Sequence, residues 1–301
     1  MRRLTVHSIL ILAVLVAPLT CRAAGEKYKQ LTSLYLDEKG GGLKNPEGVA
    51  CNDKGTLIVA DTANGRLLRY SYADGGVKGG TEMKPSQLAY PIRLQLAPAG
   101  DIYALDERLH RIVHLNAEGA FVGYLEPQGV PAPATLSLRS FRIDASGSLY
   151  LLDLFGERVV VLDAAGKFVR QLSLPADHGF FSDLAVTGGG DILLLDSVRA
   201  EVTVARKDAA AFTPLTKNLR EYVNFPTYLT VDGRGGIYLV DQDGGAIVTL
   251  GPDGSYTGRI ATLGWKEGQL YYPSQVSFCG SAILAVADRN NSRIQLFEAQ
   301  K

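Results

Sequence analysis

The sequence is poor in the residues that most often carry metal or redox chemistry. Its 301 residues include 4 histidines, 3 cysteines and 2 methionines, and 31 basic residues balance 31 acidic ones. This even charge gives no basis for nucleic-acid binding. We find no glycine-rich phosphate loop, no nucleophile elbow and no haem-attachment motif. No linker or low-complexity tract divides the chain, and no segment has a convincing helical period.

The N-terminal residues have the layout of a signal peptide. Arg2 and Arg3 precede the apolar run SILILAVLVA, which ends at Pro18 and gives way to small residues. A membrane-spanning helix needs about 20 apolar residues, so we expect no stable transmembrane anchor. We expect cleavage to remove residues 1–23 and residues 24–301 to be exported, to the periplasm or outside the cell. Lipid attachment at Cys21 is the alternative.

One phrase, an apolar run that ends in aspartate, occurs six times. It first reads LIVADTANGRLLRY at residues 57–70, and the copies are 43 to 47 residues apart. The repeated aspartates are Asp61, Asp106, Asp153, Asp196, Asp241 and Asp288. Such a regular spacing indicates a repeat architecture.

Each repeat is predicted to contain four strands joined by three turns. A short strand and a glycine-containing turn precede each aspartate phrase, and a second turn and a further strand follow it. This unit is typical of a β-propeller blade, so residues 24–301 are predicted to form an all-β, six-bladed propeller of four-stranded antiparallel blades. The sixth repeat lacks its outer strand, and we expect residues 28–36 to supply it beside residues 293–298.

The repeated aspartates are interpreted as structural. Each would end the second strand of its blade, where a carboxylate accepts hydrogen bonds from backbone N–H groups of the loop. An arginine follows five residues later in four repeats, where it would pair with the same or a neighbouring carboxylate. These arginines are Arg66, Arg111, Arg158 and Arg293.

The first and last repeats resemble the NHL repeat. NPEGVACNDKGTLIVADTANGRLLRY and YPSQVSFCGSAILAVADRNNSRIQLF share its proline, short strand, turn and apolar strand ending in Ala-Asp, followed by Asn and Arg. The resemblance covers essentially all of residues 24–301 and is weakest in the fourth repeat. It implies a six-bladed NHL or TolB-like propeller, a fold that serves as a platform for ligand, protein or RNA binding and in a minority as an enzyme.

The resemblance also implies two enzymatic alternatives. Amidating lyases of this family hold zinc with histidines from separate blades, but His110 and His114 would lie roughly 13 Å apart on one strand. Related lactonases hold a divalent metal on the axis, and Glu47 and Asp183, from opposite blades, are the weak candidates to share a cation. Arg93 at the same level disfavours a cation. We therefore predict no cofactor, with an axial divalent cation and a metal-dependent hydrolase or lyase as the alternative.

Binding is the function that the sequence favours. The starts of the inner strands bring together side chains of mixed charge that suit a protein, peptide or glycan partner. These candidate residues are Glu47, Arg93, Arg139, Asp183, Tyr228 and Gln275. We therefore expect an exported, non-catalytic binding propeller. Cys51 and Cys279 end the inner strands of the first and sixth blades, which adjoin in the ring, and are candidates for a disulfide.

Overall fold

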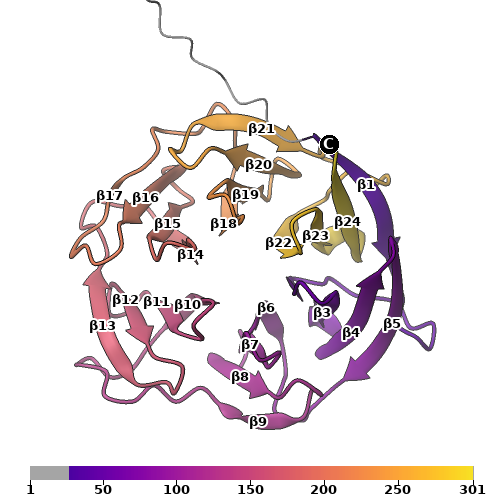
Figure 1. The fold of residues 1–301 in the computed structure, drawn as a ribbon, viewed down its shortest axis with the longest axis horizontal. Helices are drawn as coiled ribbons and strands as arrows, with labels where there is room; N and C mark the ends of the chain where they lie inside the picture. Colours follow the sequence, from indigo (N-terminus) through magenta and orange to yellow (C-terminus); the bar gives the residue numbers. More distant parts are fainter. Residues whose placement is uncertain (1–26, 301) are drawn as a thin grey trace, which may run out of the picture.

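Six four-stranded antiparallel sheets stand around a central axis in the computed structural model, which describes residues 27–300 (Figure 1). This confirms the predicted six-bladed β-propeller. The predicted signal peptide, residues 1–23 with Cys21, lies outside the described residues. Residues 27–300 hold no helix with the length and hydrophobicity of a membrane span.

The first three blades follow one another along the chain, each from its inner to its outer strand. They comprise β2 (Gly48–Cys51), β3 (Thr56–Asp61), β4 (Arg66–Ala73) and β5 (Gly76–Met83); β6 (Pro91–Leu96), β7 (Ile102–Asp106), β8 (Arg111–Leu115) and β9 (Phe121–Tyr124); and β10 (Leu138–Ile143), β11 (Leu149–Asp153), β12 (Arg158–Leu162) and β13 (Phe168–Ser173). A short 3-10 helix, η1 (Thr62–Asn64), follows β3.

The last three blades keep this order, except that the chain's first strand completes the sixth. They comprise β14 (Phe181–Val186), β15 (Ile192–Asp196), β16 (Glu201–Ala205) and the two-residue β17 (Thr213–Pro214); β18 (Pro226–Val231), β19 (Ile237–Asp241), β20 (Ala246–Leu250) and β21 (Tyr256–Ile260); and β22 (Pro273–Cys279), β23 (Ile283–Asp288), β24 (Arg293–Gln300) and β1 (Lys27–Leu34), with η2 (Arg289–Asn291) after β23.

Strand β1 closes the ring. It pairs antiparallel with β24, so that Lys27 lies opposite Gln300 and Leu34 opposite Ile294. Figure 1 shows the N-terminal strand on the outside of the blade that carries the chain's C-terminal end. The prediction that an N-terminal strand completes the last blade is therefore confirmed, and this strand ends at Leu34.

The hydrophobic core is divided among the contacts between neighbouring blades. Each of six buried clusters draws its side chains from two adjacent blades; one, for example, joins Leu195 and Val202 of the fourth blade to Leu229 and Leu239 of the fifth. The second strands are buried on both faces, which is why their sequences are apolar runs rather than alternating patterns.

The strand directions define two faces of the propeller. Each inner strand starts where the second strand ends in its aspartate, because neighbouring strands are antiparallel. We call this side, with the six aspartates and the connectors that enter the inner strands, the aspartate face. The turns between inner and second strands form the opposite face.

Candidate functional site

The six repeated aspartates fasten the connectors of the aspartate face to the blades. All six are buried. Asp106, for example, accepts hydrogen bonds from the backbone N–H groups of Ala89 and Tyr90, just before its inner strand, and from Leu109 in the following loop. The carboxylates thus satisfy donors on both segments and fix the start of the inner strand.

Arginines reinforce three of these carboxylates. Nε of Arg66, Arg158 and Arg293 lies 2.7, 3.0 and 2.7 Å from the aspartate five residues earlier. Arg111 instead reaches towards Glu126, with 3.8 Å between the charged atoms and both side chains exposed. Asp241 has Arg259 of the outer strand as its ion-pair partner, at 3.4 Å.

A repeated β-bulge shapes the start of the inner strands. In the second to sixth blades the pairing with the second strand shifts register within the first residues, for example between Pro91 and Arg93. Arg139 occupies such a bulge, and Arg93 and Asp183 follow theirs. Bulges re-aim side chains, and here they lie next to Arg93, Arg139 and Asp183.

Buried aromatic and charged side chains lie near the axis, next to these bulges. We call Tyr228, Arg93, Arg142 and Asp183 the plug. Tyr228 is buried, and the guanidinium carbons of Arg93 and Arg142 lie 5.4 and 4.4 Å from the centre of its ring. Burial raises the pKa of the Tyr228 hydroxyl, against the opposing effect of Arg142. The ring, as a neutral phenol, therefore lies within cation–π distance of two guanidinium groups.

Asp183 is part of this plug rather than of the surface. Its carboxylate accepts hydrogen bonds from Ser140, from Nη2 of Arg142 at 2.8 Å and from the backbone N–H of Leu229 at 2.9 Å. It thereby links the third, fourth and fifth blades.

Gln275 has a comparable structural role on the other side of the axis. Its amide exchanges two hydrogen bonds with the backbone of Leu94, at 3.1 and 2.8 Å, joining the sixth blade to the second. The first blade, between them, has Gly48 at this level. A Cβ atom on Gly48 would lie 3.0 Å from side-chain atoms of both Ala60 and Leu94, so a larger residue here would have to displace these neighbours.

Glu47 and Arg139 lie nearer the surface of the aspartate face. Nε of Arg289 is 3.2 Å from Oε1 of Glu47. Burial raises the pKa of Glu47, and the charges of Arg289, Arg93 and Arg139 act in the other direction. Burial and the charge of Arg93 lower the pKa of Arg139, which also experiences the charges of Glu47 and Asp183. The structure thus brings Glu47, Arg93, Arg139 and Asp183 into one electrostatic unit, and it adds Arg142 and Arg289.

The acids proposed for an axial cation each have an arginine partner. Asp183 is bonded to Arg142 and Glu47 lies beside Arg289. Within residues 27–300 no group of three or more His, Cys, Asp or Glu side chains is arranged to hold a metal ion. His110 precedes β8 in a left-handed conformation, and His114 is bonded to Asp101.

Exposed apolar side chains gather in the loops of the aspartate face. Phe155 and Trp265 are the most exposed, at 65% and 77%. The full set on this face is Tyr35, Leu36, Phe155, Phe180, Val198, Phe225, Leu263, Trp265, Tyr271 and Tyr272. The other exposed large apolar side chains of the described residues lie on outer strands; they are Val122, Val169 and Tyr256.

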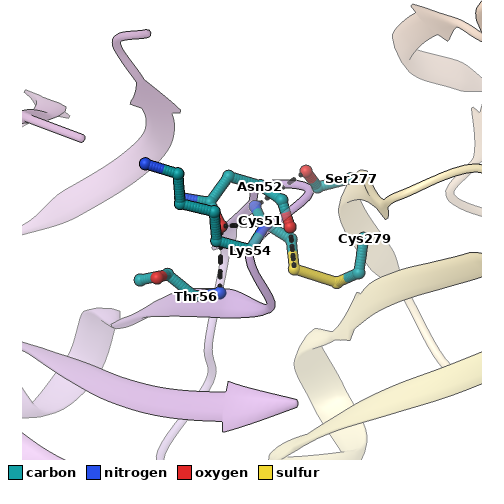
Figure 2. Close-up of a disulfide and its surroundings, with 6 residues drawn as sticks. All are labelled: Cys51, Asn52, Lys54, Thr56, Ser277 and Cys279. Carbon is teal, nitrogen blue, oxygen red and sulfur yellow. Dashed lines mark hydrogen bonds between the residues drawn. A yellow bond between two sulfur atoms is a disulfide. The ribbon is translucent and has the colours of Figure 1, made fainter. Parts of the chain in front are cut away.

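A disulfide joins the inner strands of the first and sixth blades near the opposite face. Cys51 and Cys279 are bonded, with 5.0 Å between their Cα atoms (Figure 2). The backbone N–H of Cys51 also donates to Ser277 Oγ at 3.0 Å, while Asn52 orders the adjacent turn through Lys54 and Thr56. A cavity of about 180 Å³ is lined in part by Cys51, Gln95, Arg142, Tyr228 and Ser277.

The comparisons with known proteins agree with this architecture. Six four-stranded blades around one axis define the chain as a six-bladed β-propeller. Residues 43–70, which include β2, β3 and the start of β4, match the NHL repeat family. The resemblance of the first repeat to NHL sequences is confirmed. A search of curated proteins finds no match.

Solved structures that share the fold have different functions. One is a catalytically inactive virginiamycin B lyase from Staphylococcus aureus with quinupristin, which is 14% identical in sequence. The match covers 91% of this chain and 100% of the lyase chain, with a TM-score of 0.63. A gluconolactonase from Xanthomonas campestris is 15% identical. The match covers 94% of this chain and 93% of the gluconolactonase chain, with a TM-score of 0.64. A chain of a nidogen/laminin complex is 17% identical. The match covers 76% of this chain and 84% of that chain, with a TM-score of 0.60. At such identities the likeness concerns the fold.

Proposed function

We propose that this chain is an exported, non-catalytic binding platform that recognises a protein, peptide or glycan partner on its aspartate face. The observation that carries the proposal is the collection of exposed aromatic and aliphatic side chains on that face, around a charged centre. Contiguous exposed apolar surface marks interaction sites, and arginine and aromatic residues are enriched where partners bind. The likeness to the nidogen/laminin complex supports a binding role for such a propeller.

Export is part of the same proposal. The signal-peptide pattern of residues 1–23 supports it, and so does the Cys51–Cys279 bond, because disulfides persist in oxidising compartments.

The test compares two double variants that remove the same kind of surface. Phe155→Ser with Trp265→Ser changes the aspartate face, whereas Val122→Ser with Val169→Ser removes side chains of 56% and 57% exposure on the outer strands. Tagged residues 24–301 of each variant and of the wild type are used for affinity capture from an envelope extract. The affinity of any captured partner is then measured with purified components.

The expected result is a partner bound by the wild type and by the outer-strand variant but lost from the aspartate-face variant. Equal binding by all three proteins would move the interaction away from the aspartate face. Loss of binding in both variants would point to a general effect of surface polarity and would equally contradict the proposal.

A metal-dependent hydrolase or lyase is the second candidate, favoured by the likeness to virginiamycin B lyase and gluconolactonase structures. On this fold the axial acids Glu47 and Asp183 would have to exchange their arginine partners for a metal. A panel of lactones and esters, assayed with and without added divalent ions, tests it. Turnover that depends on the ion and is lost in Glu47→Gln would replace the binding proposal.

A further inference from the structure

Unpartnered polar atoms are concentrated at the axis of the aspartate face. Nε of Arg93, Arg139 and Arg289 and Oγ1 of Thr227 are buried and make no hydrogen bond within the protein. These four residues come from the second, third, sixth and fifth blades and occupy the starts of inner strands or the loop after an aspartate. We call these four residues, together with Glu47, the axial arginine cluster.

Such a concentration requires a physical explanation, because buried polar groups nearly always have partners. Leaving a charged donor buried without a partner is more unfavourable than leaving a neutral donor so. Arg93 and Thr227 are only 5% and 7% exposed, so bulk solvent does not reach most of either side chain. Nη1 of Arg93 donates a hydrogen bond of 3.1 Å to the carbonyl of Ile92, but Nε of Arg93 has no acceptor.

The charge balance of the cluster is positive. Asp183 is hydrogen-bonded to Arg142 of the plug, and its charge also acts on Arg139. Glu47 stands 3.2 Å from Nε of Arg289, yet no hydrogen bond satisfies that nitrogen. The negative charge of Glu107, an exposed residue, also acts on Glu47 and Arg139. The three arginines of the cluster outnumber its one acid, Glu47, and their Nε atoms make no hydrogen bond, so the cluster favours an anion.

We propose that the axial arginine cluster binds a carboxylate group of a protein partner, either an aspartate or glutamate side chain or a chain end. A carboxylate offers two oxygens to the planar fork of a guanidinium, and such bonds are stronger than those between neutral groups. This inference rests on the proposed function, since it names the chemistry by which the aspartate face recognises its partner.

The surroundings of the cluster favour a protein as the source of the carboxylate. The guanidinium of Arg139 lies 5.6 Å from the ring centre of Phe180, so aromatic surface adjoins the charged centre. Val198, in the loop after Asp196, is exposed on the same face. A buried charged anchor within an apolar and aromatic surround is the arrangement found at the energetic centre of protein interfaces.

The test uses propionate and propionamide, which have nearly the same shape and differ in charge. The Nε–Hε signals of the arginines in isotope-labelled residues 24–301 are followed by NMR while each compound is added. Propionate is expected to shift the signals of Arg93, Arg139 and Arg289 to saturation, and propionamide is expected to leave them in place. Equal responses to both compounds, or shifts that rise linearly without saturation, would overturn the inference.

Two arginine variants localise the effect. Arg139→Gln is expected to weaken propionate binding at least about tenfold, because it removes one of the charged donors. Arg108→Gln is the matched control, since Arg108 is exposed on the same face and lies 5.6 Å from the ring of Tyr90, outside the cluster. Unchanged binding in Arg139→Gln, or an equal loss in both variants, would overturn the assignment to the cluster.

Further anions separate the sources of the ligand. Inorganic phosphate or glucuronate that binds more than about tenfold tighter than propionate would replace the protein carboxylate by a phosphate or an acidic sugar. The titration needs no partner, so its outcome is distinct from that of the capture experiment. A partner captured through Phe155 and Trp265 without saturable propionate binding would keep the proposed function and reject this inference.

Discussion

Asp183 in the fourth blade accepts a hydrogen bond of 2.9 Å from the backbone N–H of Leu229 in the fifth. The same carboxylate is bonded to Ser140 and Arg142 of the third blade. Three consecutive blades are thus connected near the axis by one buried acid. A residue that the sequence offered as a binding candidate holds the scaffold together.

We predict that Asp183→Ala lowers the free energy of unfolding by about 3–5 kcal/mol, because it leaves Arg142 as a buried charge without its acid. Urea denaturation followed by circular dichroism measures this change. Asp177→Asn is the control, since Asp177 also pairs with an arginine, Arg199, but its side chain is 91% exposed. An exposed pair contributes little, so a comparable loss in both variants would contradict the structural role of Asp183.

The second prediction concerns Asp196 and pH. Burial acts to raise its pKa, but hydrogen bonds from the backbone N–H groups of Arg199, Gly179, Phe180 and Val198 outweigh burial and hold the pKa below its ordinary value. A carboxyl group with a lowered pKa stabilises the fold at pH values above its unfolded-state pKa. This contribution is lost as pH falls through the folded-state pKa.

Asp196→Asn is therefore expected to be less stable than the wild type by about 2 kcal/mol at neutral pH. The difference should shrink as the solution is acidified, because the wild-type carboxyl group becomes protonated. Urea denaturation at about pH 7 and about pH 3 measures both values. Asp208→Asn, in an exposed turn, is the control and should follow the wild type at both pH values. A gap that stays constant or widens on acidification would refute the assignment.

The fold was predictable because its signals are periodic and local. Six aspartates at spacings of 43 to 47 residues and the missing outer strand of the last repeat determine the blade number and the ring closure. Each buried hydrophobic cluster joins only two adjacent blades, so a pattern within one repeat carries most of the information about the fold.

The site was harder to predict because side chains of different blades choose their partners across the axis. Glu47 and Asp183 are the weak candidates that the sequence offers for a shared axial cation, and the structure places each beside an arginine, Arg289 and Arg142. Arg142 follows Ser140 by two positions on β10. Because side chains two positions apart on a strand point to the same face, the sequence could have placed Arg142 beside Ser140, further along the strand from the aspartate face. Nothing in the sequence shows which bulged residue stays at the surface and which enters the plug.

Gly48 is the subject of the third prediction. Gly48→Ala is expected to destabilise the protein by about 1–3 kcal/mol, because the added Cβ crowds Ala60 and Leu94, whose backbone is bonded to Gln275. Thermal or urea unfolding measures it. Gly233→Ala serves as the control, since no atom lies within 4 Å of the Cβ it adds. Equal stability of the two variants would show that the axis has room for a side chain in the first blade.

The last prediction separates the two devices that close the ring. Cys51 and Cys279 are 228 residues apart, and for such a loop the chain-entropy relation gives a contribution of up to about 5 kcal/mol. Cys51→Ser with Cys279→Ser should therefore lower the free energy of unfolding by up to that amount.

The pairing of β1 with β24 does not depend on the disulfide, so the β1 amides that bond to β24 should remain protected from hydrogen exchange in the double variant under native conditions. Mass spectrometry of peptides that span Lys27–Leu34 measures this protection. Rapid exchange in the oxidised wild type would contradict closure by β1. Loss of protection in the double variant alone would mean instead that the covalent bond holds the last blade against the first and that β1 pairs only once the ring is closed.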